Sequence, residues 1–182
     1  PHLRSWRDGW RHLRFLLLFS PSWLFYYPGL LLLLAGLGGM AWLLPGERTL
    51  GNVHLGVNTL VFAAAAIVCG FQATSFYMFA HTHAEKIGLL PPEPLVRRLA
   101  AALNLEIGLI VGGLAFFVGL GMALYAVGAW GGQSFGNLNP EQSLRIVIPS
   151  ATLIILGLQI VFSSCLLGIL QLETPARDGA GR

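Results

Sequence analysis

The chain has 182 residues, of which 55% are hydrophobic and only 10% are charged, and its mean hydropathy is +0.69. Because so few polar side chains cannot cover the surface of a water-soluble domain, the composition excludes such a domain and indicates a membrane protein. The formal net charge of +3 does not indicate nucleic acid, because the eleven Lys and Arg residues lie beside apolar segments, where they suit anionic lipid. Membrane lipids are expected partners and nucleic acid is not.

The first 20 residues predict an amphipathic helix that lies on the membrane surface. On a helix, an apolar row is formed by Leu3, Trp6, Trp10, Leu13 and Leu17. A second row beside it consists of Arg4, Arg7, Arg11 and Arg14. If Trp6 and Trp10 anchor the helix in the interface, the arginines lie at the depth of lipid phosphates. Two interpretations remain open: general anchoring to an anionic leaflet, or binding of the phosphate of a lipid substrate.

Four later segments are long and apolar enough to cross a bilayer, which takes about 20 residues. They run approximately over residues 23–44, 57–80, 103–130 and 140–173. We therefore predict an all-α membrane protein, with a surface helix (1–20), a transmembrane domain of four helices in two hairpins (21–174) and a tail (175–182). Positive charge follows one side of these spans, because nine of the eleven basic residues lie in the N-terminal segment, the 81–102 loop and the tail. This excess predicts that both termini and that loop are cytoplasmic.

The two predicted hairpins resemble each other weakly in sequence. Gly51-Asn52-Val53 precedes the second span and Gly136-Asn137-Leu138 precedes the fourth, and Gly70-Phe71-Gln72 is echoed by Gly157-Leu158-Gln159. The spacing between the echoes changes along the chain, so the sequence leaves both duplication and coincidence open.

Three polar side chains within the spans are candidate functional residues, since such residues are rare in lipid: Glu106, Gln72 and Gln159. For Glu106, pairing with nearby arginines competes with a role in handling a ligand. For the two glutamines, a hydrogen bond across a helix contact competes with a substrate route. One side of the third span carries small residues, including Gly108 and Gly112, which predicts close helix packing and leaves a homo-oligomer open.

The alternation of His81, His83 and Glu85 invites a metal interpretation. On a helix His83 points away from the other two, and no further ligands accompany them, so we predict no metal site in this chain.

Residues 3–17 (LRSWRDGWRHLRFLL), followed by Ser20-Pro21 and Tyr27-Pro28-Gly29, resemble the junction in bacterial family 2 glycosyltransferases of the dolichol-phosphate mannose or glucose synthase type. The resemblance continues through Gly70-Phe71-Gln72, Leu105-Glu106 and Leu156-Gly157-Leu158-Gln159. In that family a GT-A catalytic domain leads through a surface helix into a membrane domain. The resemblance implies transfer of a hexose from a nucleotide sugar to polyprenyl phosphate (dolichyl or undecaprenyl phosphate) at the cytoplasmic face of a bacterial inner membrane.

The resemblance implies that the catalytic domain lies upstream, in the same polypeptide, and that it holds a Mg or Mn ion. The metal-binding Asp-x-Asp of the family does not occur here, because Asp8 is the only Asp before Asp178, so no catalytic residue carries over. We expect this chain to be the membrane anchor and lipid-acceptor platform of such an enzyme, without a cofactor of its own. The alternatives are a small four-helix transporter or flippase partner, and a structural assembly module.

Overall fold

A computed structural model describes residues 9–10, 22–51, 53–94, 96, 98–99, 104–132 and 140–171. A π-helical turn, η1 (Ser22–Tyr26), leads directly into α2 (Tyr27–Leu43), and two short strands follow, β1 (Arg48–Leu50) and β2 (Val53–Leu55). The three remaining helices are α3 (Val57–Lys86), α5 (Leu105–Gly131) and α6 (Pro140–Gln171). Four helices of the described part are long and apolar enough to span a membrane, which confirms the predicted multi-pass architecture.

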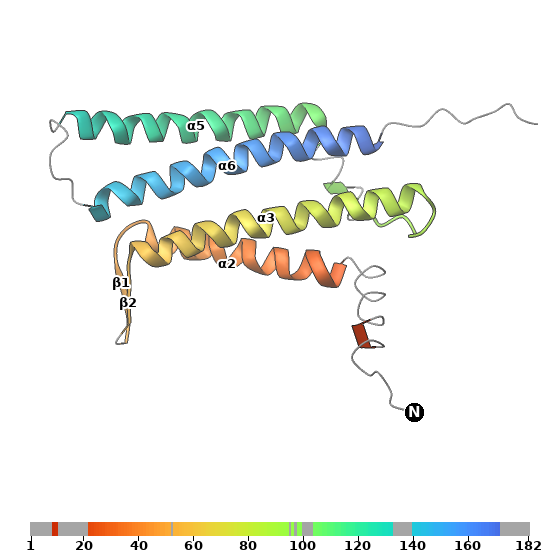
Figure 1. Ribbon diagram of the computed structural model, residues 1–182, viewed down its shortest axis with the longest axis horizontal. Helices are drawn as coiled ribbons and strands as arrows, with labels where there is room; N and C mark the ends of the chain where they lie inside the picture. Colours follow the sequence, from red (N-terminus) through yellow and green to blue (C-terminus); the bar gives the residue numbers. More distant parts are fainter. Residues whose placement is uncertain are drawn as a thin grey trace, which may run out of the picture.

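The helices form two hairpins that lie side by side. Helix α2 packs on α3, α5 packs on α6, and α3 and α6 join the two hairpins, so that α2 and α5 lie on the outside (Figure 1). Ser22, Lys86, Leu105 and Gln171 lie at one end of this array, which we call the entry end because the chain enters α2 there. The β1–β2 hairpin lies at the opposite end, the hairpin end.

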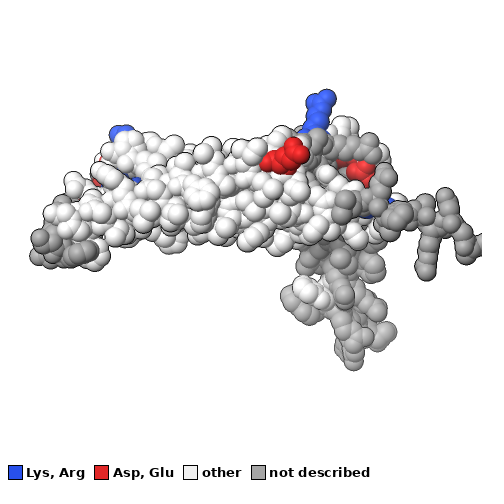
Figure 2. All heavy atoms as spheres, turned by 90° about the horizontal axis from the view of Figure 1, so that it is seen from above, with Lys and Arg blue, Asp and Glu red and all other residues white. Residues whose placement is uncertain are grey.

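Charged side chains gather towards the two ends of the array, and the face between them is uncharged (Figure 2). Large apolar side chains are exposed along every spanning helix; examples are Leu31, Phe62, Phe117 and Phe162. An exposed apolar belt between charged ends suits lipid on the sides and water at the ends.

Close contacts between glycines and facing backbone bring the helices of each hairpin together. A Cβ atom on Gly36 would lie 2.7 Å from the carbonyl oxygen of Ala63, and one on Gly119 would lie 2.8 Å from that of Ser150. In the same way, a Cβ on Gly70 would meet the carbonyl oxygen of Gly29. These contacts explain why the apolar spans keep so many glycines, since small residues let helix backbones approach in lipid.

The contacts repeat from one hairpin to the other. Gly157 of α6 is placed against Gly112 as Gly70 of α3 is placed against Gly29, with a Cβ-to-oxygen distance of 2.6 Å in both cases. The sequence echo around Gly70 and Gly157 therefore corresponds to equivalent positions in two similar hairpins, which favours duplication over coincidence. In the other echo, Gly51 turns the β1–β2 hairpin with a φ of +60°, and residues 136–138 lie outside the described part.

At each end of the array, a hydrogen bond and a cluster of buried apolar residues join the two hairpins. At the hairpin end, Arg145 of α6 donates from Nη1 to the carbonyl oxygen of Leu43 at 2.6 Å. At the entry end, Lys86 of α3 donates from Nζ to the carbonyl oxygen of Leu170 at 3.0 Å. Both cations satisfy carbonyls in the last turn of a helix, where the helix dipole favours positive charge. Buried residues form one cluster at each end: Leu43, Val57, Leu60, Ala64 and Ile148; and Tyr77, Met78, Val96 and Leu167.

The structure differs from the sequence predictions in local details. Helix α3 continues to Lys86, beyond the predicted end at residue 80, and the two short strands were not predicted. The π-helical turn before α2 precedes Pro28, which lacks the N–H that a continuous α-helix would use. The predicted surface helix lies almost wholly outside the described residues, as does the tail.

Candidate functional site

The arginine row and the first of the two tryptophan anchors cannot be placed. Arg4, Trp6, Arg7, Arg11 and Arg14 lie outside the described residues. Trp10 is helical and 58% exposed, so its ring is available to the surroundings. The proposed roles of this row stay predictions.

Glu106 lies in the first turn of α5, at the entry end. Its side chain is exposed, and the preceding Asn104 caps the helix by accepting a hydrogen bond from the N–H of Ile107 at 2.9 Å. A carboxylate in this turn is stabilised by the positive end of the helix dipole. This position suits a structural role for Glu106, and a role in handling a ligand stays a prediction.

Gln72 and Gln159 meet at the contact between the two hairpins. Nε2 of Gln159 donates to Oε1 of Gln72 at 2.7 Å, and both side chains are half-buried. The two residues occupy equivalent positions, each two residues after the closely packed Gly70 or Gly157. The hydrogen bond across the helix contact accounts for Oε1 of Gln72 and Nε2 of Gln159, whereas Oε1 of Gln159 is buried and has no hydrogen-bond partner in the described part of the chain.

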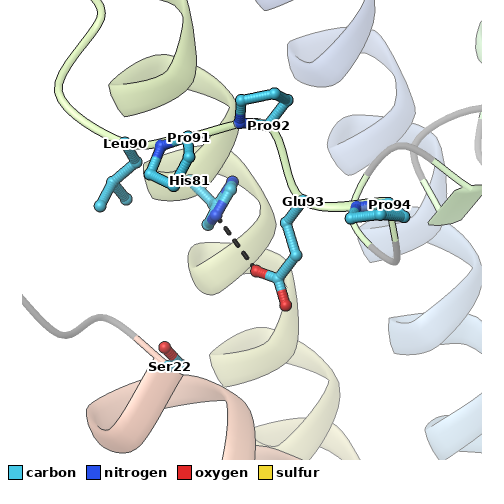
Figure 3. Close-up of a pocket in the computed structure, with 7 residues that line it drawn as sticks. All are labelled: Ser22, His81, Leu90, Pro91, Pro92, Glu93 and Pro94. Carbon is cyan, nitrogen blue, oxygen red and sulfur yellow. Dashed lines mark ion pairs between the residues drawn. The ribbon is translucent and has the colours of Figure 1, made fainter.

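A pocket of about 290 Å³ opens at the entry end, between the start of η1, the end of α3 and the loop that follows α3 (Figure 3). Its lining residues are Ser22, His81, Leu90, Pro91, Pro92, Glu93 and Pro94. Glu93 reaches back from the proline-rich loop to α3. Its Oε2 lies 3.2 Å from Nε2 of His81 and accepts a 2.8 Å hydrogen bond from the hydroxyl of Tyr77.

Both α3 residues that hold Glu93 are buried. Tyr77 and His81 are one helical turn apart on α3, and their exposed fractions are 2% and 5%. With Nε2 directed at the carboxylate, Nδ1 of His81 is buried and has no hydrogen-bond partner in the part of the chain that the structure describes. A buried polar atom without a partner is energetically costly, at about 1–3 kcal/mol.

Aromatic rings continue from this cluster to the membrane surface. Tyr26 packs on Tyr77 and on Tyr27, with ring centroids 5.0 and 5.5 Å apart, and Tyr27 packs on Trp23 at 5.0 Å. Trp23 and Tyr27 are largely exposed, which is typical of aromatic side chains at a membrane interface, whereas Tyr77 is buried.

Sequence reasoning missed Glu93 as a functional candidate. His81 was considered only for a metal, with His83 and Glu85; in the structure His83 is exposed and His81 pairs with Glu93 instead. No group of three His, Cys, Asp or Glu side chains suited to a metal ion occurs among the described residues. The sequence did contain one signal. Glu93 stands alone between two prolines, and a tight turn after α3 can bring it back to His81.

Comparison with known proteins identifies the family. The model of the glycosyltransferase family 2 C-terminal transmembrane region matches residues 78–171, just over half of the chain. The chain is similar to the low-salt glycan biosynthesis hexosyltransferase Agl6 of Haloferax volcanii, with 29% identity over 169 residues. That alignment covers 93% of this chain and 40% of the relative, so the chain spans less than half of the relative's length. No solved structure matches the chain significantly. With four spanning helices and this family match, the chain belongs to the family 2 glycosyltransferases as a C-terminal transmembrane region.

Proposed function

We propose that this chain anchors a family 2 glycosyltransferase in the membrane and presents the lipid acceptor, polyprenyl phosphate, to its catalytic domain. The family match carries the proposal, and the similarity to a hexosyltransferase supports a hexose as the transferred sugar. The catalytic domain precedes this chain in the same polypeptide and holds the nucleotide sugar with a Mg or Mn ion. The chain supplies the membrane side of the reaction and no catalytic residue.

Transfer takes place at the entry end of the array, on the cytoplasmic side of the membrane. A domain that precedes residue 22 emerges at this end, because α2 begins there. The excess of basic residues in segments that border this end supports a cytoplasmic position. A transporter has less support, because the two mid-span amides bond to each other and the charged groups lie towards the ends.

Arg4, Arg7, Arg11 and Arg14 hold the phosphate of the acceptor at the membrane surface. Arginine binds a phosphate through two parallel hydrogen bonds, whereas lysine presents a point charge. Replacing all four by Lys keeps the net charge, and should raise the apparent KM for polyprenyl phosphate several-fold in the enzyme with its catalytic domain.

The KM for the nucleotide sugar serves as the internal control and should not change. We expect Arg7 or Arg11, which stand closest to the two tryptophans in the predicted helix, to account for most of the effect. Unchanged acceptor kinetics in the all-Lys variant would reduce the row to general anchoring.

A further inference from the structure

The pocket at Glu93 is built on two α3 side chains, Tyr77 and His81, that have no counterpart of the same kind in α6, although the two hairpins pack in the same way. Counting from Gly70 and Gly157, the positions that correspond to Tyr77 and His81 are Ser164 and Gly168 of α6. The second hairpin thus has a serine and a glycine at the positions where the first has the aromatic rings of Tyr77 and His81. The packing that the two hairpins share therefore does not require Tyr77 and His81, and their contacts with Glu93 are a separate feature of the first hairpin.

The carboxylate of Glu93 is held through one of its two oxygens. Tyr77 and His81 both bind Oε2, and Oε1 accepts no hydrogen bond from the part of the chain that the structure describes. The Glu93 side chain is 44% exposed on the pocket. A contact that only holds the loop on α3 would explain the bonds to Oε2, but it would not explain the cavity onto which the Glu93 side chain is exposed.

The loop side of the pocket offers few backbone hydrogen-bond donors. Pro91, Pro92 and Pro94 have no N–H, and the N–H of Leu90 is already donated to the carbonyl oxygen of Ala84 at 3.3 Å. The carboxylate of Glu93 adds negative charge. A phosphate would meet the like charge of Glu93, whereas an ammonium or guanidinium group would find a carboxylate as its partner.

We propose that this pocket receives a basic side chain, Arg or Lys, of the preceding catalytic domain and thereby docks that domain on the entry end. The inference rests on the proposed function, because it requires such a domain. The curated relative is more than twice as long as the aligned segment, which leaves room for the domain. Ser22, where the chain passes into the first spanning helix, itself lines the pocket, so the segment that connects an upstream domain to the membrane part enters it beside the pocket.

Site-specific photo-crosslinking of the full-length protein in membranes tests the docking. Benzoylphenylalanine replaces Leu90, which lines the pocket, and in a matched control it replaces the neighbouring Leu89, which is 64% exposed and does not line it. Leu90 should crosslink to a peptide that precedes Pro1 and contains Arg or Lys, and Leu89 should crosslink to it much less. Crosslinking of Leu90 only to lipid, to a peptide within this chain or to nothing would overturn the proposal.

Variants of Glu93 supply the charge test. Glu93→Gln keeps the shape and removes the charge, so the Leu90 crosslink to the upstream peptide should fall about tenfold. Glu93→Arg should abolish the crosslink, and reversing the crosslinked cation to Glu in the same protein should restore it. A crosslink that is insensitive to Glu93→Gln would contradict a charged docking contact. If the full-length protein transfers sugar but Leu90 crosslinks only to lipid, the docking inference fails while the proposed function stands.

Discussion

At the residue scale, the bond between Gln72 and Gln159 joins the two hairpins in the middle of the membrane. Replacing either residue by Leu leaves the other amide without its partner, and should cost about 0.6–2 kcal/mol of stability. The double variant should recover part of that loss, because no unpaired amide remains. Reversible unfolding in detergent, analysed as a double-mutant cycle, measures the coupling. Additive losses would show that the 2.7 Å contact contributes nothing.

Single residues also show where sequence reasoning ends. The mid-span position of the two glutamines predicted a bond across a helix contact, because an amide in lipid needs a partner. Glu93 could not be paired with Tyr77 and His81 from the sequence, because the pairing depends on how the proline-rich loop returns over α3. Glu106 lies in the first turn of α5, as expected from a third span that begins near residue 103.

Within the second hairpin, some glycines lie against the backbone of the facing helix and others face open space. Gly157 meets the backbone of α5, so Gly157→Ala should force α5 and α6 apart and cost about 1–3 kcal/mol. Gly113 on α5 faces open space, so Gly113→Ala should be neutral or should stabilise the helix by up to about 1 kcal/mol. Thermal unfolding of the two variants in the same detergent compares them. Equal losses would contradict the close packing of the hairpin.

The spanning helices were predictable because length and apolarity alone determine what can cross a bilayer. The beginning of α6 at Pro140 agrees with the expected proline in the first turn. Two features carry no comparable signal: the three-residue strands β1 and β2, and the last turns of α3. Each strand is too short for a pattern, and the His- and Lys-containing end of α3 is helical because it packs against the loop and α6 rather than because it is apolar.

At the scale of the whole molecule, the orientation is the first prediction. In a variant without Cys69 and Cys165, cysteines introduced at Asn52 and Asn137 should label from outside intact cells, because basic residues hold the opposite end in the cytoplasm. A cysteine at the exposed Leu89, at the entry end, is the matched control and should label only after permeabilisation. The reverse pattern would invert the proposed orientation.

The proposed function divides the reaction between the membrane part, which presents the lipid acceptor, and the upstream domain, which transfers the sugar. It is tested most directly by measuring transfer of a radiolabelled hexose from its nucleotide sugar to polyprenyl phosphate, in one membrane preparation and for two proteins. The purified chain alone should form no glycolipid, because no residue in it is assigned to hold a nucleotide diphosphate with its metal ion. The polypeptide that carries the upstream domain should form it. Glycolipid made by the isolated chain, or none made by the longer polypeptide with any hexose donor, would contradict the account.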